Sequence, residues 1–531
     1  MRCSLAAKLC LVNTVCRLAL VCALQAQQVP EKPSSAPLES AGKAADKPEL
    51  QGDPAKDVTP YLRKFIDILA TVQTESADPE PVDKLVYEGA IPSMLRQLDP
   101  HTQFFDPAQF NQLKQMEDSE QKGFGSIVSV LPGQVIFLQT LPGTPSNKAG
   151  IQAGDELVAI NNVGIARLEP QQIIELLTEA RQQKVTIYIR RPGNARILPF
   201  TLTPELVDSP SVDRAFLLAT GYGYIRVSSW DLQTARQLQD AIQKLGGNKL
   251  AGLVLDLRNN PGGIVKTALD AAALFLQPGQ KILTARGRTS EVETASVPDK
   301  VSPYQFKIAV LINEKTASAS EILSGALQDH DRAVIVGEPS YGKGLVQSVL
   351  PLSEGTGLAI TTAFYYTPSG RSIQRPLRNS ALSETFAESS APQLPEYKTD
   401  RGRVVRGGGG IQPDVLISPA PLSRLETVLE ASGAVTQFAT DYLSKHGPLS
   451  SPFEVTPEIL DELRVFLSAR QIQPNIAEWG AERTWISNRL KQEIVTQAKG
   501  VDKGDEIEAG HDVQVEAALK AMQDKSLSAA R

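Results

Sequence analysis

Ile308-Ala-Val-Leu-Ile-Asn-Glu-Lys-Thr-Ala-Ser-Ala-Ser-Glu-Ile-Leu-Ser-Gly-Ala-Leu327 joins a strand pattern to a helix pattern. The apolar run over 308–312 is typical of a buried strand, and residues 319–327 carry apolar side chains at helical spacing. Ser318 therefore falls at a strand-to-helix junction, where backbone N–H groups and the positive end of the helix face incoming negative charge. Such a junction is suited to stabilising an oxyanion, so Ser318 is a candidate nucleophile.

A serine hydroxyl is a weak nucleophile at neutral pH and needs a neighbouring proton acceptor. A lysine can be that acceptor only where burial keeps its amine neutral. Gly337-Glu-Pro-Ser-Tyr-Gly-Lys-Gly-Leu-Val-Gln347 places Lys343 in a turn that leads into a predicted strand over 345–350. Because strand side chains alternate with period 2, Lys343 and Gln347 share one face, and Gln347 could hold the lysine amine by a hydrogen bond.

Each of these motifs also has an ordinary structural interpretation. Ser318-Ala-Ser-Glu321 is a capping box, which would make Ser318 a helix N-cap and nothing more. The lysine between two glycines could equally lie in a solvated turn. Residues 337–343 match a phosphate-binding loop until the next position, where Gly344 replaces the Ser or Thr that would hold magnesium. A strand pattern follows where such a loop needs a helix, so a nucleotide site is not expected.

Several separate motifs occur in one order along the chain: 256–263 (Asp-Leu-Arg-Asn-Asn-Pro-Gly-Gly), 315–322, 326–329, 337–347, 365–373 and 410–414. Together they resemble the carboxyl-terminal processing peptidases, also called tail-specific proteases, over roughly residues 61–419. The resemblance implies a serine endopeptidase whose catalytic group is Ser318, Lys343 and Gln347, with Ser320 as the rival nucleophile. It also implies an oxyanion hole built from the backbone N–H of Ala319 and that of Gly262 or Gly263.

Residues 118–205 resemble a PDZ domain. Such a domain captures a peptide carboxylate in a loop of backbone N–H groups and adds the peptide as an edge strand. The implied partners are protein or peptide substrates with free carboxyl-terminal tails. The alternative is that some of the implied binding residues are merely domain core. The residues that the resemblance assigns to the carboxylate loop are Gly123, Phe124, Gly125 and Ser126, and those assigned to the side-chain pocket are Ile127, Ile173 and Leu177.

The fold class expected is α/β multidomain. From residue 223 onward, predicted strands and helices alternate, which favours a layered α/β core. The resemblance implies a crotonase-like serine protease core over 206–420, into which the PDZ domain is inserted. Helical spacing of apolar residues predicts an amino-terminal helical segment over 58–117 and a carboxyl-terminal helical region over 421–531. These terminal regions are candidates for forming a homodimer.

Composition argues against other classes of protein. The formal net charge of −6 gives no sign of a nucleic-acid footprint. The four histidines lack a ligand partner at zinc spacing, so neither a metal site nor a cofactor is expected. His101 is expected to be structural rather than catalytic.

The first residues resemble a secretory signal. All four cysteines lie within the first 22 residues, which leaves the body of the chain without a disulfide. Arg2, Lys8, an apolar stretch and an Ala-Leu-Gln-Ala end predict a signal peptide over 1–26, followed by a flexible linker over 27–57. The protein is accordingly expected to be secreted or periplasmic. An uncleaved membrane anchor is the alternative, but no apolar run approaches about 20 residues.

The expected function is cleavage of protein substrates by a Ser318/Lys343 dyad, with the PDZ domain recognising carboxyl-terminal tails. A catalytically silent peptide-binding scaffold that uses only the PDZ domain is the alternative. The presence of Ser318, Lys343 and Gln347 argues against it, because a silent scaffold would tolerate their loss.

Overall fold

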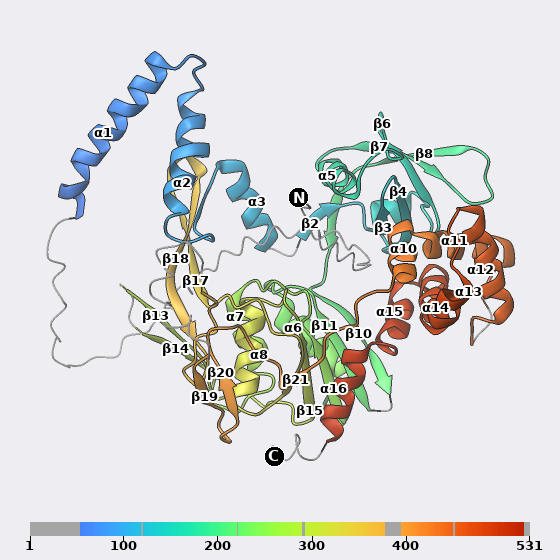
Figure 1. Cartoon of the computed structure of the whole chain (residues 1–531). Helices are drawn as coiled ribbons and strands as arrows, with labels where there is room; N and C mark the ends of the chain where they lie inside the picture. Colours follow the sequence, from blue (N-terminus) through green and yellow to red (C-terminus); the bar gives the residue numbers. More distant parts are fainter. Residues whose placement is uncertain are drawn as a thin grey trace, which may run out of the picture.

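The computed structural model describes residues 54–117, 120–219, 221–288, 292–376, 394–449 and 452–524. The expected signal peptide and nearly all of the expected linker lie outside these residues. Within the described ranges, no helix combines the length and the apolar character needed to span a bilayer. Figure 1 shows a central α/β core, a helical arm on one side of it, and a small sheet with a group of helices on the other.

A six-stranded sheet forms the core. Its central strands are apolar runs, which suit burial on both faces where helices cover both sides. In spatial order the strands are β10 (Val212–Ala219), β11 (Tyr222–Val227), β12 (Gly252–Asp256), β15 (Lys307–Ile312), β16 (Val334–Gly337) and β21 (Val415–Leu416). β10 runs antiparallel to β11, and the remaining neighbours are parallel. The loops after β12 and β15 therefore emerge at the same edge of the sheet, which is where ligands bind in open parallel sheets.

Side chains of the core strands alternate between two apolar clusters. Ile308 and Val310 belong to a cluster with helices α6 (Thr234–Leu245), α7 (Val265–Ala272) and α8 (Ala319–Asp329). Ala309 and Leu311 belong to a second cluster, which includes α16 (Val513–Gln523) from the end of the chain. Three helices thus cover one face, and α16 covers part of the other.

A second sheet stands beside the core and brings distant segments together. β17 pairs with β18, and β18 also pairs with β1 and β13. β1 comes from the amino-terminal segment and pairs with β18, which in turn pairs with β17, the strand that follows the Lys343 turn. The strands are β1 (Gln103–Phe105), β13 (Lys281–Gly287), β14 (Glu293–Ser296), β17 (Leu345–Pro351) and β18 (Gly357–Tyr366). A separate hairpin is formed by β19 (Glu396–Lys398) and β20 (Val404–Arg406).

The PDZ region is a sheet with the order β3-β4-β5-β7-β8, in which β6 pairs with β5. The chain enters and leaves it through two strands that pair with each other, β2 (Glu120–Gly123) and β9 (Glu205–Asp208). β3 lies at the edge of the sheet. The elements are β3 (Ser126–Leu131), β4 (Gln134–Thr140), α4 (Pro145–Lys148), β5 (Glu156–Ile160), β6 (Val163–Gly164), α5 (Pro170–Ala180), β7 (Val185–Arg190) and β8 (Ile197–Leu202).

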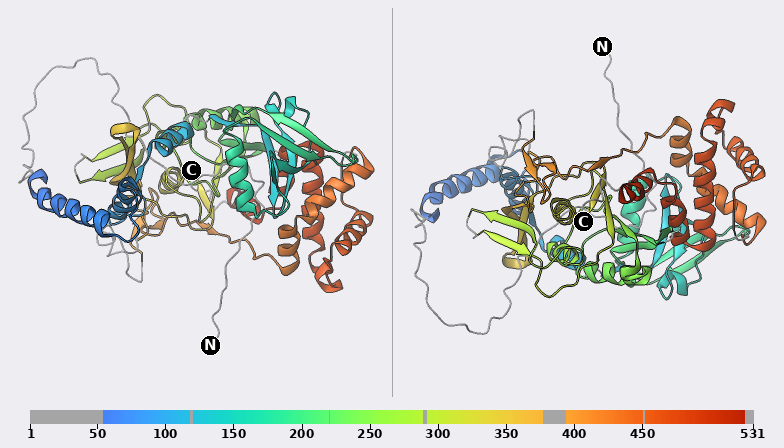
Figure 2. Two further views of the ribbon diagram at one scale, coloured as in Figure 1. Left: turned by 90° about the horizontal axis from the view of Figure 1, so that it is seen from above. Right: turned by 90° about the horizontal axis from the view of Figure 1, so that it is seen from below.

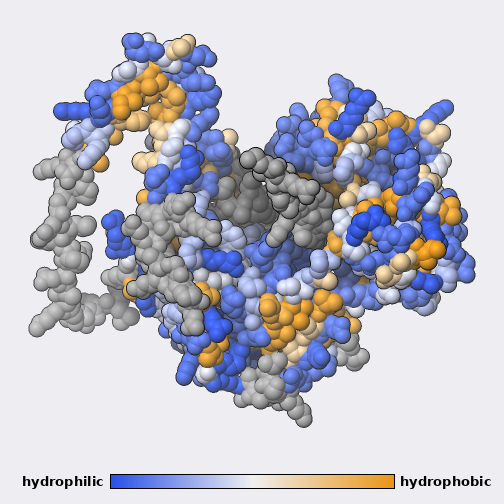
Figure 3. Space-filling view, viewed as in Figure 1, coloured by the Kyte–Doolittle hydropathy of each residue, from blue (hydrophilic) through white to orange (hydrophobic). Residues whose placement is uncertain are grey.

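The amino-terminal segment is an arm made of α1 (Pro54–Glu75), a π-helical turn over Lys84–Ala90, α2 (Ile91–Leu95) and α3 (Pro107–Glu117). Helix α1 exposes large apolar side chains, including Leu62, Ile66 and Ile68. Figure 3 shows apolar side chains gathered on the upper part of this arm. The structure describes one chain, so the homodimer expected through the terminal helical regions stays a prediction.

The carboxyl-terminal helices lie beside the PDZ sheet in every view (Figure 2). Gln437 donates to Gln134, and the N–H of Val501 donates to the side chain of Gln139 at 2.9 Å. The last helix then runs back onto the core sheet. The helices are α10 (Arg424–Ser432), α11 (Ala434–His446), α12 (Pro457–Ala469), α13 (Ile476–Ala481), α14 (Arg483–Lys499), α15 (Val501–Ala509) and α16.

Candidate active site

Ser318 occupies the sharp turn between β15 and α8. Its backbone has φ 54° and ψ −117°, which is a conformation that side-chain-bearing residues rarely adopt. An ordinary N-cap residue has extended backbone angles instead. Such strained positions cost about 1–3 kcal/mol and cluster at functional sites. Ser318 forms the predicted capping box with Glu321, and its strained backbone distinguishes it from an ordinary helix cap.

Lys343 is buried, with 6% of its surface exposed, in the segment that leads into β17. Its Nζ donates a hydrogen bond to Oε1 of Gln347 at 2.9 Å. Burial lowers the pKa of Lys343 to about 8, although the charges of Asp99 and Glu321 oppose the decrease. A lysine in this environment can be a base, because a substantial fraction of its amine is neutral near neutral to mildly alkaline pH.

Glu321 joins the serine loop to the lysine loop. Its Oε2 accepts the N–H of Ser318 at 2.8 Å and the N–H of Lys343 at 2.9 Å. Its Oε1 accepts the N–H of Gly342 at 2.7 Å and the hydroxyl of Ser340 at 2.5 Å. Burial raises the pKa of Glu321, and these four hydrogen bonds oppose the rise. Sequence reasoning saw Glu321 only as half of a capping box, whereas it also holds the second loop in place.

Tyr365 on β18 makes a second connection between the two loops. Its hydroxyl donates to the backbone carbonyl of Lys343 and also lies 3.2 Å from the carbonyl oxygen of Ser318. Residue 365 lay in a motif of the family resemblance, but no role was predicted for its side chain. The hydroxyl and Glu321 together fix the backbone on both sides of the site.

The amino-terminal segment contributes to the lysine environment. Gln347 Nε2 donates to the backbone carbonyl of His101 at 2.6 Å, which orients its Oε1 toward Lys343. Burial, followed by the charge of Lys343, lowers the pKa of His101 to about 4, so the imidazole is neutral at neutral pH. The Asp99 carboxylate accepts the N–H groups of His101 and Thr102 and thereby shapes this turn. Sequence reasoning missed Asp99 and Thr102.

The glycine turn after β12 lies against the serine loop. The N–H of Ala317 donates to the carbonyl of Asn260 at 3.0 Å. The N–H of Gly262 donates to Oδ1 of Asn260 at 2.8 Å and is therefore already engaged. Among the described residues, neither the N–H of Gly263 nor that of Ala319 donates a backbone hydrogen bond. Of the two glycines considered, Gly263 is thus the one whose donor is available.

Ser320, the rival nucleophile, lies inside the first turn of α8. Its hydroxyl oxygen accepts the indole N–H of Trp230 at 2.8 Å. Trp230 also pairs with the glycine turn, because its N–H donates to Gly262 and its carbonyl accepts the N–H of Ile264. Ser320 therefore has a structural partner that packs α8 against the glycine turn.

The residues assigned to the PDZ loop run from the last residue of β2 to the first residue of β3. The carbonyl of Phe124 accepts the N–H of Ser146, and the carbonyl of Gly125 accepts the N–H of Leu141 at 2.8 Å. Gly125 has φ 70°, and a Cβ there would meet the Thr144 side chain at 2.3 Å. The turn thus needs glycine at this position.

The structure separates the apolar residues expected in the PDZ pocket. Ile173 is fully buried in the domain core, and Leu177 and Phe124 are partly buried against that core. Ile127 instead packs with Leu138 and Val501, which belongs to the carboxyl-terminal helices. Ile127 therefore lies in a different cluster from Ile173.

Comparisons with known proteins agree with this architecture. The sequence model of Peptidase family S41 matches residues 221–377, and that of the PDZ domain matches residues 137–191. The chain is 34% identical over 317 residues to a carboxy-terminal-processing protease of Bartonella bacilliformis, covering 59% of this chain and 72% of the relative. It is 35% identical over 321 residues to a carboxyl-terminal-processing protease of Synechocystis, covering 58% of this chain and 74% of the relative.

Among solved structures, the chain is similar to a photosystem II D1 C-terminal processing protease. The match has 26% identity and covers 68% of this chain and 88% of that one, with a TM-score of 0.38.

Proposed function

Since the chain belongs to the carboxyl-terminal processing proteases, which are serine-type peptidases of family S41, we propose that Ser318 is its nucleophile and Lys343 its general base. The observation that carries the proposal is the environment of Lys343, a buried amine with a pKa lowered to about 8 and held by Gln347. Glu321 ties this amine's loop to the strained turn of Ser318. The silent-scaffold alternative is not favoured.

The proposed reaction proceeds through an acyl-enzyme. Ser318 Oγ attacks the carbonyl carbon of the scissile peptide bond while its proton passes to the neutral Nζ of Lys343. The carbonyl electron pair moves to oxygen, and the N–H groups of Ala319 and Gly263 donate hydrogen bonds to the resulting oxyanion. Collapse breaks the C–N bond, and the leaving amine takes the proton from Lys343.

Hydrolysis of the acyl-enzyme repeats these roles. A water molecule gives a proton to Lys343 and adds to the ester carbonyl. Collapse releases the new carboxyl terminus and returns the proton to Ser318 Oγ. Gln347 takes no proton in either half; it is a positioning residue, because its Oε1 accepts from the lysine and its amide group is held by His101.

The pH dependence of cleavage tests the identity of the base. Lys343 accepts a proton only when neutral, and its pKa is about 8. We therefore expect kcat/KM to rise about tenfold per pH unit below that value and to level off above it. The measurement is a kcat/KM profile from about pH 6 to about pH 9 with folding monitored by circular dichroism.

Asp99→Asn is the matched variant for this profile. The charge of Asp99 raises the pKa of Lys343, so removing it should move the ascending limb to lower pH. A flat profile in the wild type, or a limb that moves to higher pH in Asp99→Asn, would show that another group is the base.

Tail recognition by the PDZ domain is a second part of the proposal. β3 is an edge strand, so its unpaired side can accept an added peptide strand, as PDZ ligands require. The turn 123–126 would bind the terminal carboxylate through backbone N–H groups. Phe124 and Leu177, which are only partly buried, would contact the terminal side chain. Ile127 and Ile173 would support this surface from within the fold.

A substrate with a free apolar carboxyl terminus should be cleaved faster than its amidated twin, because amidation removes the charge that the N–H groups bind. The expected difference is about tenfold in kcat/KM, measured with two peptides of the same sequence. Leu177→Ser should narrow the difference. Glu179→Ala, at an exposed position of the same helix, should leave it unchanged. Equal rates for the two peptides in the wild type would remove tail recognition from the mechanism.

A further inference from the structure

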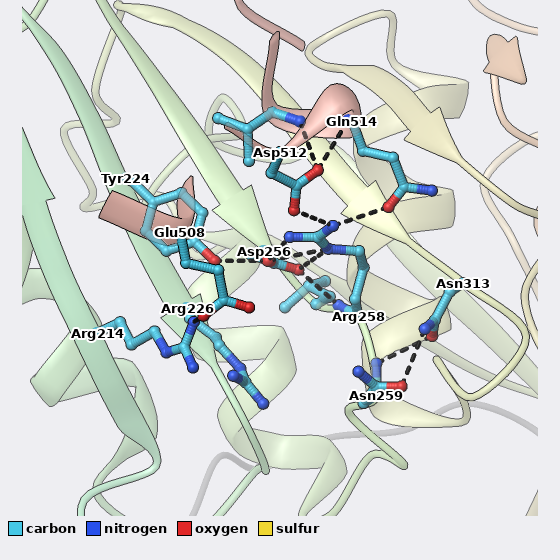
Figure 4. A network of polar contacts seen from close by, with 12 residues as sticks. Arg214, Tyr224, Arg226, Asp256, Arg258, Asn259, Asn313, Glu508, Asp512 and Gln514 are labelled. Carbon is cyan, nitrogen blue, oxygen red and sulfur yellow. Dashed lines mark hydrogen bonds and ion pairs between the residues drawn. The ribbon is translucent and has the colours of Figure 1, made fainter. Parts of the chain in front are cut away.

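The carboxyl-terminal helices are joined to the turn that carries the proposed oxyanion glycine. Arg258 follows β12 and lies between two acidic groups from distant parts of the chain (Figure 4). Its Nε and Nη2 donate to the Asp256 carboxylate at 3.0 and 2.6 Å. Its Nη1 donates to Asp512 Oδ2 at 2.6 Å and to Gln514 Oε1 at 2.8 Å, both at the start of α16. The guanidinium is thus held at both ends.

The Asp256 end of this network is rigid. Asp256 is buried at the end of β12, and it also accepts the hydroxyl of Tyr224 at 2.6 Å. Its Oδ1 accepts the backbone N–H of Arg258 at 2.9 Å. Because the planar guanidinium binds a carboxylate in a fixed fork geometry, Asp256 sets the direction in which Arg258 points. The contacts of Arg258 with α16 are then the ones that can be lost without disturbing the sheet.

The backbone from Arg258 to Gly263 is short and continuous with the serine loop. Asn259 has φ 59°, and its N–H donates to Oδ1 of Asn313 at 2.9 Å while Asn313 returns a hydrogen bond from Nδ2 at 3.0 Å. The hydroxyl of Thr316 donates to the carbonyl of Leu257 at 2.8 Å. The turn 257–263 is therefore pinned to the serine loop on one side and to α16, through Arg258, on the other. A shift of Arg258 would move the turn relative to Ser318.

Docking of α16 does not depend on Arg258 alone. Val515, Ala518 and Met522 are buried against the second face of the core sheet. At the far end of the helix, Lys307 Nζ donates to the carbonyl of Met522 at 2.7 Å. The contacts just described hold α16 on the sheet. The polar groups at the start of α16 make additional contacts with Arg258, beside the turn.

We propose that Asp512 and Gln514 are positioning residues for the oxyanion hole, and that the carboxyl-terminal helices act through Arg258 to hold the turn 257–263 against Ser318. The inference rests on the proposed function, in which the N–H of Gly263 stabilises the oxyanion. It gives residues 501–524 a role in the reaction, because α15 and α16 connect the PDZ sheet at Val501 to the turn at Arg258.

Asp512→Ser separates positioning from helix capping. Oδ1 of Asp512 caps α16 by accepting the N–H of Gln514 at 2.8 Å, and a serine hydroxyl can replace that bond. The shorter side chain leaves Arg258 without its carboxylate. We expect kcat to fall about tenfold while KM changes by less than about twofold, because only transition-state stabilisation is lost. Asp512→Asn keeps the helix cap through its single oxygen but turns an amide N–H group toward Arg258, so its kcat should fall to a similar extent.

A peptide boronic acid provides a second readout in the full-length protein. Its tetrahedral adduct on the serine presents an oxygen to the oxyanion hole, so its affinity for Asp512→Ser should fall by the same factor as kcat. Binding of an uncleaved substrate peptide to Ser318→Ala should be unchanged when Asp512→Ser is added. These two results together distinguish positioning of the hole from general loosening of the fold.

Lys307→Met is the matched control, since it removes a hydrogen bond between α16 and the sheet at the end remote from the turn. It should lower the thermal unfolding midpoint and leave kcat unchanged. The inference would be overturned if Asp512→Ser kept the wild-type kcat. It would also be overturned if Asp512→Ser and Lys307→Met showed equal losses of kcat and of thermal unfolding midpoint. Failure of the proposed function has a separate sign, because Ser318→Ala would then cleave as fast as the wild type. That result would overturn the inference as well.

Discussion

Ser318→Ala should lower kcat/KM for peptide cleavage by about 10⁴-fold or more, with the folded structure retained. The substitution removes the attacking oxygen, and no neighbouring group can replace it in an acyl-enzyme mechanism. Lys343→Ala should have a loss of similar size, because a serine hydroxyl without a base remains protonated. Both losses are measured as cleavage of a denatured protein and of a peptide, with circular dichroism as the check on folding.

Ser320→Ala is the control that decides between the two serines of the motif. Its hydroxyl accepts the indole N–H of Trp230, so the variant should lose about 1 kcal/mol of stability. It should keep appreciable activity, since the hydroxyl has no part in the proposed reaction. If Ser318→Ala turned over at the wild-type rate while Ser320→Ala did not, the nucleophile would have been assigned to the wrong residue.

The family and the PDZ domain could be predicted from local sequence, and the comparisons confirm both. The reason is that each motif is contiguous in the sequence, and its residue spacing is set by a single helix, strand or turn. Lys343 and Gln347 are four residues apart on a strand pattern, and the structure contains the hydrogen bond between them at 2.9 Å. Ser318 lies at the junction where an apolar run changes to helical spacing, and the structure places it between β15 and α8.

The partners of these residues could not be predicted, because they come from elsewhere in the chain. Gln347 is held by a carbonyl at residue 101, and Glu321 by N–H groups at residues 342 and 343. The Ser-x-x-Glu pattern predicts only the local hydrogen bond of Glu321, which it makes with the N–H of Ser318 at the first turn of the helix. Likewise, helical spacing predicts α16 but does not indicate that the start of this helix contacts Arg258.

The direction in which a strand side chain points was also hard to predict from the sequence. Period-2 alternation predicts which side a residue points to only while the pairing register is unbroken. The β3–β4 pairing shifts between Ile127 and Val128, which is a bulge or irregularity. Val128 consequently joins the PDZ core, and Ile127 packs against the carboxyl-terminal helices.

Gly263→Ala should lower kcat by about 10²- to 10³-fold, the cost of losing one oxyanion donor. Gly263 has φ 145°, and a Cβ there would lie 2.0 Å from the backbone carbonyl oxygen of Trp230. That oxygen accepts the N–H of Ile264 and is part of the backbone, so it cannot move aside as a flexible side chain would. The turn must shift instead, and the N–H of residue 263 moves with it. The measurement is kcat and KM for peptide cleavage, with thermal unfolding recorded in parallel.

Gly279→Ala distinguishes this collision from the general cost of placing alanine at a positive φ. Gly279 has φ 76° on the surface, and nothing lies within 4 Å of a Cβ built there. Its replacement should cost about 1 kcal/mol in stability and nothing in kcat. Gly263→Ala should differ in kind, because the loss should be in kcat with KM little changed, as expected when ground-state binding survives and the oxyanion loses a donor. If Gly263→Ala kept the wild-type kcat, the N–H of Gly263 would have no part in the oxyanion hole, and Ala319 would need another partner.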